Sequence, residues 1–162
     1  MEQTPLIFIH GLEGSSQGVK ASLLRGLFPG ILTPDFRGSL EARMELLREV
    51  LGEARGWVII GSSFGGLMAA LFACERPEQV NRLVLLAPAL LWPDFASHPP
   101  GPVSIPTIIY HGSEDELLPL QPVRALAERT FSNLEFRAVA DDHGLYKTVH
   151  TIDWLKILGE NP

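Results

Sequence analysis

A G-x-S-x-G pattern is found in the stretch Trp57-Val58-Ile59-Ile60-Gly61-Ser62-Ser63-Phe64-Gly65-Gly66, between an apolar strand and the apolar helical run 67–73. A sharp turn from strand to helix strains its central residue, and residues two before and two after it must lack side chains. Gly61 and Gly65 meet that need. The turn also places Ser63 at the start of a helix, where free N–H groups favour developing negative charge. We therefore predict that Ser63 is a nucleophile; the alternative is an ordinary glycine-rich turn in which Ser62 or Ser63 caps the helix.

A serine hydroxyl is a weak nucleophile at neutral pH. A histidine must take its proton, and an acid must hold that histidine in the right tautomer. Two later loops supply candidates. The apolar run 105–110 leads into His111-Gly112-Ser113-Glu114-Asp115-Glu116-Leu117-Leu118-Pro119, and the run 134–139 leads into Ala140-Asp141-Asp142-His143-Gly144.

Strand-like and helix-like segments alternate along the chain. Short apolar runs bounded by Gly, Pro or charged residues predict buried strands at 6–9, 57–60, 83–86, 105–110 and 134–139, and helical patterns occupy 40–55, 65–75, 119–131 and 145–158. Strands that are apolar on both faces predict a parallel sheet with ligands at its carboxyl ends. We expect an α/β fold of three layers, α/β/α, with a mostly parallel sheet of about six strands, one of them a short strand near 31–33. No repeat or linker divides the chain, so residues 1–162 are predicted to form one domain.

At these loops the chain resembles the α/β-hydrolase superfamily, whose triad follows the order serine, acid, histidine. Residues 111–119 match the family's H-G-x-x-D-x-x-V-P acid loop, with Leu118 in place of valine, and Asp142-His143 matches its histidine loop. The resemblance spans nearly the whole chain and is to small, lidless serine esterases of bacterial type. It implies that Asp115 is the orienting acid and His143 the general base for Ser63.

The segment His10-Gly11-Leu12-Glu13-Gly14, after the first strand, is similar to the family's oxyanion segment. The resemblance implies that the backbone N–H groups of Leu12 and Phe64 form the oxyanion hole. A carboxylate beside an oxyanion would oppose it. We therefore expect the side chain of Glu13 to point outward.

Other histidines and acids have more ordinary explanations. His10 and His111 precede glycines and are expected to shape loops, while His98 and His150 are expected at the surface. Asp115 competes as the acid with other carboxylates that could instead be solvated loop charges: Glu114, Glu116, Asp141 and Asp142. Cys74 is expected to be a small buried hydrophobe.

The segment 88–106 lies where larger relatives insert a helical cap. It holds six prolines, so it cannot form a substantial helical lid. We expect an open site whose acyl pocket is edged by Leu90, Trp92 or Phe95. The alternative is that these side chains only cover the edge of the sheet.

Composition excludes several classes of protein. With 162 residues, 46% of them hydrophobic, the chain can build a sizeable core, and its formal charge of −6 provides no positive field for nucleic acid. One cysteine allows no internal disulfide, argues against a zinc site and fits a cytoplasmic location. No secretory signal or membrane-spanning stretch is found in the sequence.

These observations predict a serine hydrolase that cleaves carboxylic esters of small to medium acyl groups through an acyl-enzyme. The expected partner is a small-molecule ester or thioester, with no cofactor, no metal, no nucleic acid and no membrane insertion, and the oligomeric state is left open. A thioesterase would use the same side chains. Chain-end peptidase action is disfavoured because nothing would select a peptide terminus, and a binding protein on a retired hydrolase fold would be expected to lose part of the triad.

Overall fold

The computed structural model describes residues 3–159, so residues 1–2 and 160–162 of the predicted domain lie outside the described part. Its strands are β1 (Leu6–Ile9), β2 (Trp57–Ser62), β3 (Val80–Leu86), β4 (Thr107–Gly112) and β5 (Leu134–Val139). All neighbouring pairs are parallel, in the order β1-β2-β3-β4-β5. The carboxyl ends of all five strands therefore meet at one edge, where polar loops come together.

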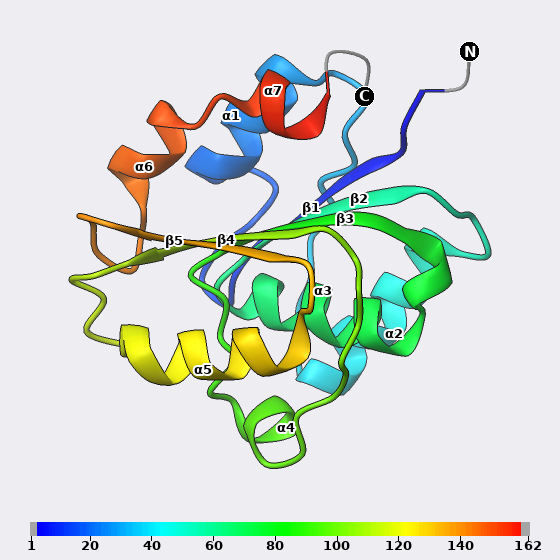
Figure 1. Ribbon diagram of the computed structural model, residues 1–162. Coiled ribbons are helices and arrows are strands. Elements are labelled where there is room, and N and C mark those ends of the chain that lie inside the picture. The colour runs from blue at the N-terminus through cyan, green and yellow to red at the C-terminus, as the bar shows by residue number, and fades with distance from the viewer. Residues whose placement is uncertain (1–2, 160–162) are drawn as a thin grey trace.

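Helices cover both faces of the sheet (Figure 1). One face carries α1 (Val19–Leu27), α6 (Tyr146–Thr151) and α7 (Trp154–Leu158), and the other carries α2 (Leu40–Leu51), α3 (Phe64–Glu75) and α5 (Leu120–Thr130). The remaining helices are a short 3-10 helix, η1 (Pro77–Gln79), and the one-turn α4 (Pro93–Ala96). The prediction of a three-layer α/β/α fold is confirmed.

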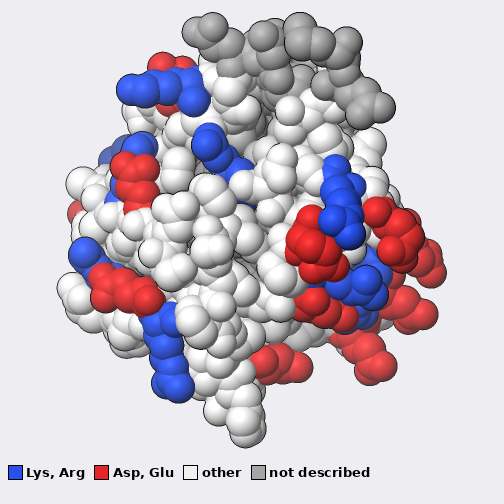
Figure 2. All heavy atoms as spheres, turned by 45° about the vertical axis from the view of Figure 1, so that its right-hand side comes forward, with Lys and Arg blue, Asp and Glu red and all other residues white. Residues whose placement is uncertain are grey.

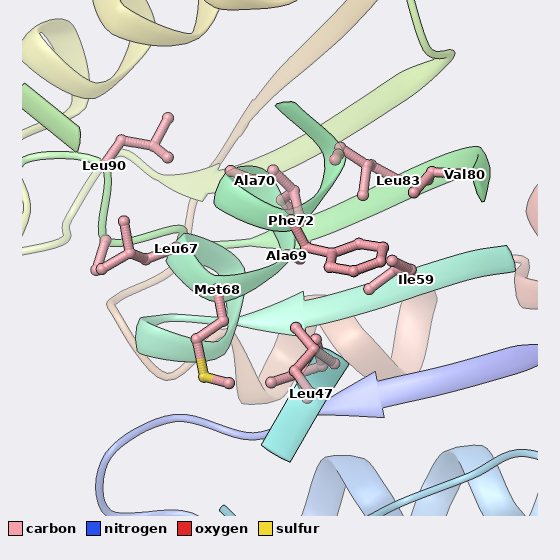
Figure 3. Close-up of a cluster of buried hydrophobic side chains, with 14 of the residues drawn as sticks. Leu47, Ile59, Leu67, Met68, Ala69, Ala70, Phe72, Val80, Leu83 and Leu90 are labelled. Carbon is pink, nitrogen blue, oxygen red and sulfur yellow. The ribbon is translucent and has the colours of Figure 1, made fainter. Parts of the chain in front are cut away.

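Each face of the sheet builds its own hydrophobic core. Alternate residues of one strand serve the two sides: Ile59 packs with α2 and α3, whereas Val58 and Ile60 pack with α1, α6 and α7. Figure 3 shows the first cluster, in which α3 lies against β2 with Leu67, Met68 and Phe72 among buried neighbours. Helix α3 is apolar on nearly all sides because the sheet and α2 enclose it. This burial fixes its N-terminus, which follows Ser63.

Among the differences from the sequence prediction, three have a clear local reason. The sixth strand is reduced to a bridge: Leu32 pairs with Ile7, and Pro34, which has no N–H, follows closely. The predicted helix 40–55 ends at Leu51 because Gly52 takes a positive φ of 55°. The predicted helix 145–158 is two helices, since Ile152 is extended and the Asp153 side chain caps α7.

The segment between β3 and β4 contains only the four residues of α4 as helix, as the six prolines predicted. Within residues 3–159 no helix is long and apolar enough to cross a membrane. Basic and acidic side chains lie intermixed on the face shown in Figure 2, and the basic ones form no continuous patch there.

Candidate active site

Ser63 sits on a strained turn between β2 and α3. Its φ of 55° and ψ of −113° lie in a region that L-residues rarely adopt. The backbone on either side holds it there: the Ser63 N–H donates to the Leu86 carbonyl at 2.8 Å, and the Ser63 carbonyl accepts from the N–H of Leu67 and of Ala89. Such strain, of order 1–3 kcal/mol, persists only where the surroundings determine the conformation.

The glycines around Ser63 are required by close backbone approach. A Cβ on Gly65 would collide with the carbonyl groups of Ile9 and His10, and a Cβ on Gly61 would collide with the Gly65 carbonyl. The first turn of α3 therefore lies directly against the ends of β1 and β2. The spacing of the two glycines predicted this contact.

Ser63, His143 and Asp115 form a chain of hydrogen bonds. Ser63 Oγ lies 2.8 Å from His143 Nε2, and His143 Nδ1 lies 2.8 Å from Asp115 Oδ2. The carboxylate can only accept, so Nδ1 carries the proton and Nε2 is left to accept from the Ser63 hydroxyl. Ser63 occupies the cap position of α3 but its side chain makes no capping hydrogen bond. The capping role considered from sequence is therefore not what occupies this hydroxyl.

Asp115 is buried and held by its own loop. Its Oδ1 accepts from the N–H groups of Leu117 and Leu118, at 3.0 and 2.8 Å, while Oδ2 faces His143. These hydrogen bonds hold the carboxylate in a single orientation. The fixed acid in turn fixes the ring of His143.

The competing carboxylates point elsewhere. Glu114 and Glu116 are exposed, and Asp142 accepts from the Gly144 N–H at 3.0 Å. Asp141 accepts from the backbone N–H and the hydroxyl of Thr148, at 3.0 and 2.9 Å. Among the described carboxylates only Asp115 hydrogen-bonds to His143.

His111 has a larger part in the site than the sequence indicated. The ring has no exposed surface, its Nε2 lies 2.8 Å from the Leu118 carbonyl oxygen, and the same atom is 3.4 Å from Asp115 Oδ2. Burial lowers the pKa of His111, although the Leu118 and Asp115 oxygens act in the opposite direction. The sequence signal was its place four residues before Asp115, but the contact could not be read from the spacing alone.

The other histidines lie where they were expected. His10 Nε2 accepts from the Phe36 N–H at 2.9 Å, which ties the loop at 35–38 to the end of β1. His98 and His150 are exposed.

The N-terminal loop lies across the turn from Ser63. A Cβ on Gly11 would be 3.4 Å from the Cβ of Ser63 and 3.9 Å from the Phe64 N. Within residues 3–159 the N–H groups of Leu12 and Phe64 have no hydrogen-bond acceptor, so both are available to a ligand. The Glu13 side chain is exposed, as expected for a carboxylate kept away from an oxyanion.

Three hydrophobic side chains were expected to edge the acyl pocket, and the structure separates them. Leu90 and Phe95 are fully buried in the core, and Figure 3 shows Leu90 near α3. Trp92 is 40% exposed, and its ring meets that of Phe64 edge to face at 5.1 Å between centroids. Of the three, Trp92 alone offers surface next to the Ser63 turn.

A comparison with known protein families gives a match over the N-terminal part of the chain. The sequence profile of the alpha/beta hydrolase fold family matches residues 4–101. This chain belongs to that family. The match includes Ser63 and the Leu12 loop, while Asp115 and His143 lie beyond it.

Solved structures resemble this α/β-hydrolase over most of their lengths. The alpha/beta hydrolase domain-containing protein 10 from mouse superposes with a TM-score of 0.77 at 17% identity, covering 98% of this chain and 93% of that one. The ferulic acid complex of Est1E from Butyrivibrio proteoclasticus has a TM-score of 0.71 at 17% identity, with 96% and 89% covered. The monoacylglycerol lipase of Paleococcus ferrophilus has a TM-score of 0.65 at 17% identity, with 91% and 93% covered. At these identities the likeness establishes the fold; no curated protein sequence matches.

In this α/β-hydrolase His143 also lines a surface cavity, whose lining does not include Ser63. A cavity of about 690 Å³ lies beside the histidine and is lined by Glu114, Glu116, Leu117, Asp142, Gly144 and Tyr146. Leu117 and Tyr146 are well exposed, and three of the lining side chains are carboxylates. A larger hollow of about 850 Å³ lies between β4, β5 and the helices α6 and α7, but it contains none of Ser63, Asp115 or His143.

The described part of the chain shows no cluster of metal ligands, and its cysteine lies near the opposite end of α3 from Ser63. Within residues 3–159 no three His, Cys, Asp or Glu side chains come together in a way that could hold a metal ion. Burial raises the pKa of the Cys74 thiol to about 11, so it is neutral at pH 7. Cys74 lies on α3 as a partly buried side chain.

Proposed function

We propose that this α/β-hydrolase is a serine esterase that cleaves carboxylic esters of small to medium acyl groups. The observation that carries the proposal is the chain of hydrogen bonds from Ser63 through His143 to Asp115, with its serine on the strained turn that opens α3. A hydroxyl, a neutral imidazole and a buried carboxylate in this order are the groups that nucleophilic acyl transfer requires.

Acylation begins when Ser63 Oγ attacks the ester carbonyl carbon. His143 Nε2 takes the hydroxyl proton as the new C–O bond forms, and Asp115 stabilises the imidazolium through Nδ1–H. The carbonyl oxygen becomes an oxyanion between the N–H groups of Leu12 and Phe64. The bond to the leaving alcohol then breaks, and His143 returns the proton to that alcohol.

Deacylation repeats these steps with water. His143 removes a proton from a water molecule that attacks the acyl carbon, and the second oxyanion is held by the same two N–H groups. Collapse of this intermediate releases a carboxylic acid and restores the Ser63 hydroxyl. The ring of Trp92, beside Phe64, provides the apolar surface for the acyl chain.

The charges around His143 favour an ester over a coenzyme-type thioester. Glu114, Glu116 and Asp142 line the cavity beside His143, the residue that would return the proton to the leaving group. A leaving group that carries phosphates would be repelled by these carboxylates. We therefore infer that the leaving group is a neutral alcohol. A much faster rate with an acyl-coenzyme A than with a neutral ester would overturn this choice.

Variants of the three side chains test the function with p-nitrophenyl acetate as substrate. Ser63→Ala and Asp115→Asn are each expected to lower kcat by about 10⁴-fold or more while the protein stays folded. Glu114→Gln and Glu116→Gln are the matched controls, since both carboxylates are exposed and it is Asp115 that hydrogen-bonds to His143; with this neutral substrate their kcat should stay within a few-fold of the parent. Full activity in Ser63→Ala would contradict the proposal.

A further inference from the structure

β5 (Leu134–Val139) is an edge strand of the sheet, and its outer edge has no partner strand within residues 3–159. The other edge strand, β1, is partly paired by the Leu32 bridge. Phe8 N–H donates to the Leu32 carbonyl, and Leu32 N–H donates to the Leu6 carbonyl. An uncovered edge strand presents a row of backbone donors and acceptors that can pair with another chain.

The hydrogen bonds to β4 determine which residues of β5 face outward. Thr107 N–H donates to the Asn133 carbonyl at one end, and Ser113 N–H donates to the Val139 carbonyl at the other. Backbone groups alternate in direction along a strand. Glu135 and Arg137 therefore also point their N–H and C=O groups toward β4. Leu134, Phe136 and Ala138 point theirs away from the sheet.

Side chains on β5 carry opposite charges two residues apart. Glu135 and Arg137 lie on the same face of the strand, with Arg137 Nη2 2.7 Å from Glu135 Oε1, and both side chains are substantially exposed. Helix α5 lies on one face of the sheet beside β5 and α6 on the other (Figure 1). No backbone pairing to the outer edge of β5 is found among residues 3–159.

This pattern is self-complementary in one antiparallel register. When two β5 strands pair around a two-fold axis at Phe136, Phe136 lies opposite its own copy and Leu134 lies opposite Ala138. These three residues are the ones whose backbone groups point outward, so they form the hydrogen-bonded pairs. Glu135 then lies opposite Arg137 of the second copy in both halves, as a non-hydrogen-bonded pair with Cα atoms about 4.5 Å apart. Opposite charges at such positions stabilise the pairing.

The neighbouring registers are penalised by the same charges. An axis at Glu135 sets Glu135 opposite its own copy, and an axis at Arg137 sets Arg137 opposite its own copy. Like charges directly opposite one another destabilise a pair of strands. The sequence of β5 therefore selects the register centred on Phe136.

We propose that a second copy of this chain binds along the outer edge of β5, so that the two sheets join through an antiparallel β5–β5 pair with its two-fold axis at Phe136. An interface of this kind uses one patch on both subunits and closes after two copies. It leaves Ser63, Asp115 and His143 of each copy outside the paired strands, so the inference does not depend on the proposed function.

Charge reversal and restoration test the proposal by sedimentation velocity at low salt and sub-millimolar concentration. The parent is expected to be a dimer. Glu135→Arg places an arginine opposite Arg137 of the second copy and another beside Arg137 of its own strand. This variant should shift the protein to monomer. The double variant Glu135→Arg/Arg137→Glu restores opposite pairs in the same register and should restore the dimer. A monomeric parent, or a dimer that neither change affects, would overturn the proposal.

Amide hydrogen exchange gives a second reading that does not rely on substitution. In the dimer, the N–H groups of Phe136 and Ala138 should be protected at high protein concentration and exchange faster on dilution. The N–H groups of Glu135 and Arg137, which face β4, serve as internal controls and should stay protected at both concentrations. Outward amides that exchange at one fast rate throughout would contradict a β5 interface.

Discussion

The Nε2 atom of His111 lies 3.4 Å from Oδ2 of Asp115, and both side chains are buried. Two histidines thus face one carboxylate, since His143 Nδ1 contacts the same oxygen at 2.8 Å. A neutral His111 can donate its Nε2 proton to the Leu118 carbonyl and thereby hold the loop that presents Asp115. Its Nδ1 is buried without a partner among the described residues.

The stability of the protein should depend on the protonation of His111. Burial lowers its pKa in the folded state below the ordinary value of about 6.5, so the unfolded chain takes up the proton first. The free energy of unfolding contributed by His111 is therefore full above pH 6.5 and decreases as the pH falls toward the folded pKa. Denaturant titrations between pH 8 and 5 should show that His111→Gln loses less stability on acidification than the parent. Parallel curves for the two proteins would rule this out.

The approach of α3 to β1 makes Gly65 sensitive to a single methyl group. Because a Cβ there would collide with the Ile9 and His10 carbonyls, Gly65→Ala should lower the free energy of unfolding by at least about 2 kcal/mol and displace Ser63. A methyl group on Gly26, in α1, would meet no atom within 4 Å outside its own stretch of helix, so Gly26→Ala should stabilise by about 0.5–1 kcal/mol. Chemical denaturation measures both changes, and equal effects would contradict the packing argument.

Trp92 and Phe95 should respond differently to truncation. Trp92→Ala removes exposed ring surface beside Phe64 and is expected to lower kcat/KM for p-nitrophenyl butyrate by about fivefold with little loss of stability. Phe95→Ala empties a buried position and should cost about 3–5 kcal/mol in unfolding free energy. Kinetics and denaturation of the two variants separate the roles. An unchanged kcat/KM in Trp92→Ala would remove Trp92 from the acyl site.

Asp141 lies in the loop that carries His143, and its hydrogen bonds with Thr148 hold this loop against helix α6. Burial alone would raise the pKa of Asp141, but hydrogen bonds from Thr148 and from the Asp142 N–H outweigh it, so the pKa is lowered. Asp141→Asn should lower the free energy of unfolding by about 1–3 kcal/mol at pH 7. The parent's advantage should persist above pH 4 and decrease as the pH falls through the lowered pKa. A constant difference down to pH 2, measured by thermal unfolding, would show that the carboxylate charge is not responsible.

Much of the fold could be predicted from the sequence because the signals for its strands and turns are local. Apolar runs between glycines and prolines located all five strands, although β3 begins three residues before the predicted start, at Val80, and β4 is shifted by two residues to Thr107–Gly112. The G-x-S-x-G spacing predicted the turn at Ser63 for the steric reason that the structure shows. Leu32 was overestimated as a strand because its short apolar run carries the same signal as a longer one, while the pairing with Ile7 is limited to one bridge.

Contacts between distant loops were harder to predict. The hydrogen bonds among Ser63, Asp115 and His143 join three strand ends, and their assignment relied on the resemblance of two loops to a known family. The burial of His111 against Asp115 could not be predicted from their four-residue spacing alone. Leu90 and Phe95 were grouped with Trp92 because all three are hydrophobic and close in sequence, and only packing distinguishes the buried pair from the exposed ring.

The role of Ser63 is tested most directly by reaction of the purified protein with a fluorophosphonate probe, followed by mass spectrometry of the labelled peptide. We expect one phosphonylated residue, Ser63, with labelling lost in Ser63→Ala and slowed in Asp115→Asn. Ser62 is the adjacent control, because the histidine bond is made by the Ser63 hydroxyl. Labelling at any other residue, or folded protein that does not react and does not hydrolyse p-nitrophenyl acetate, would contradict the assignment of Ser63 as the nucleophile.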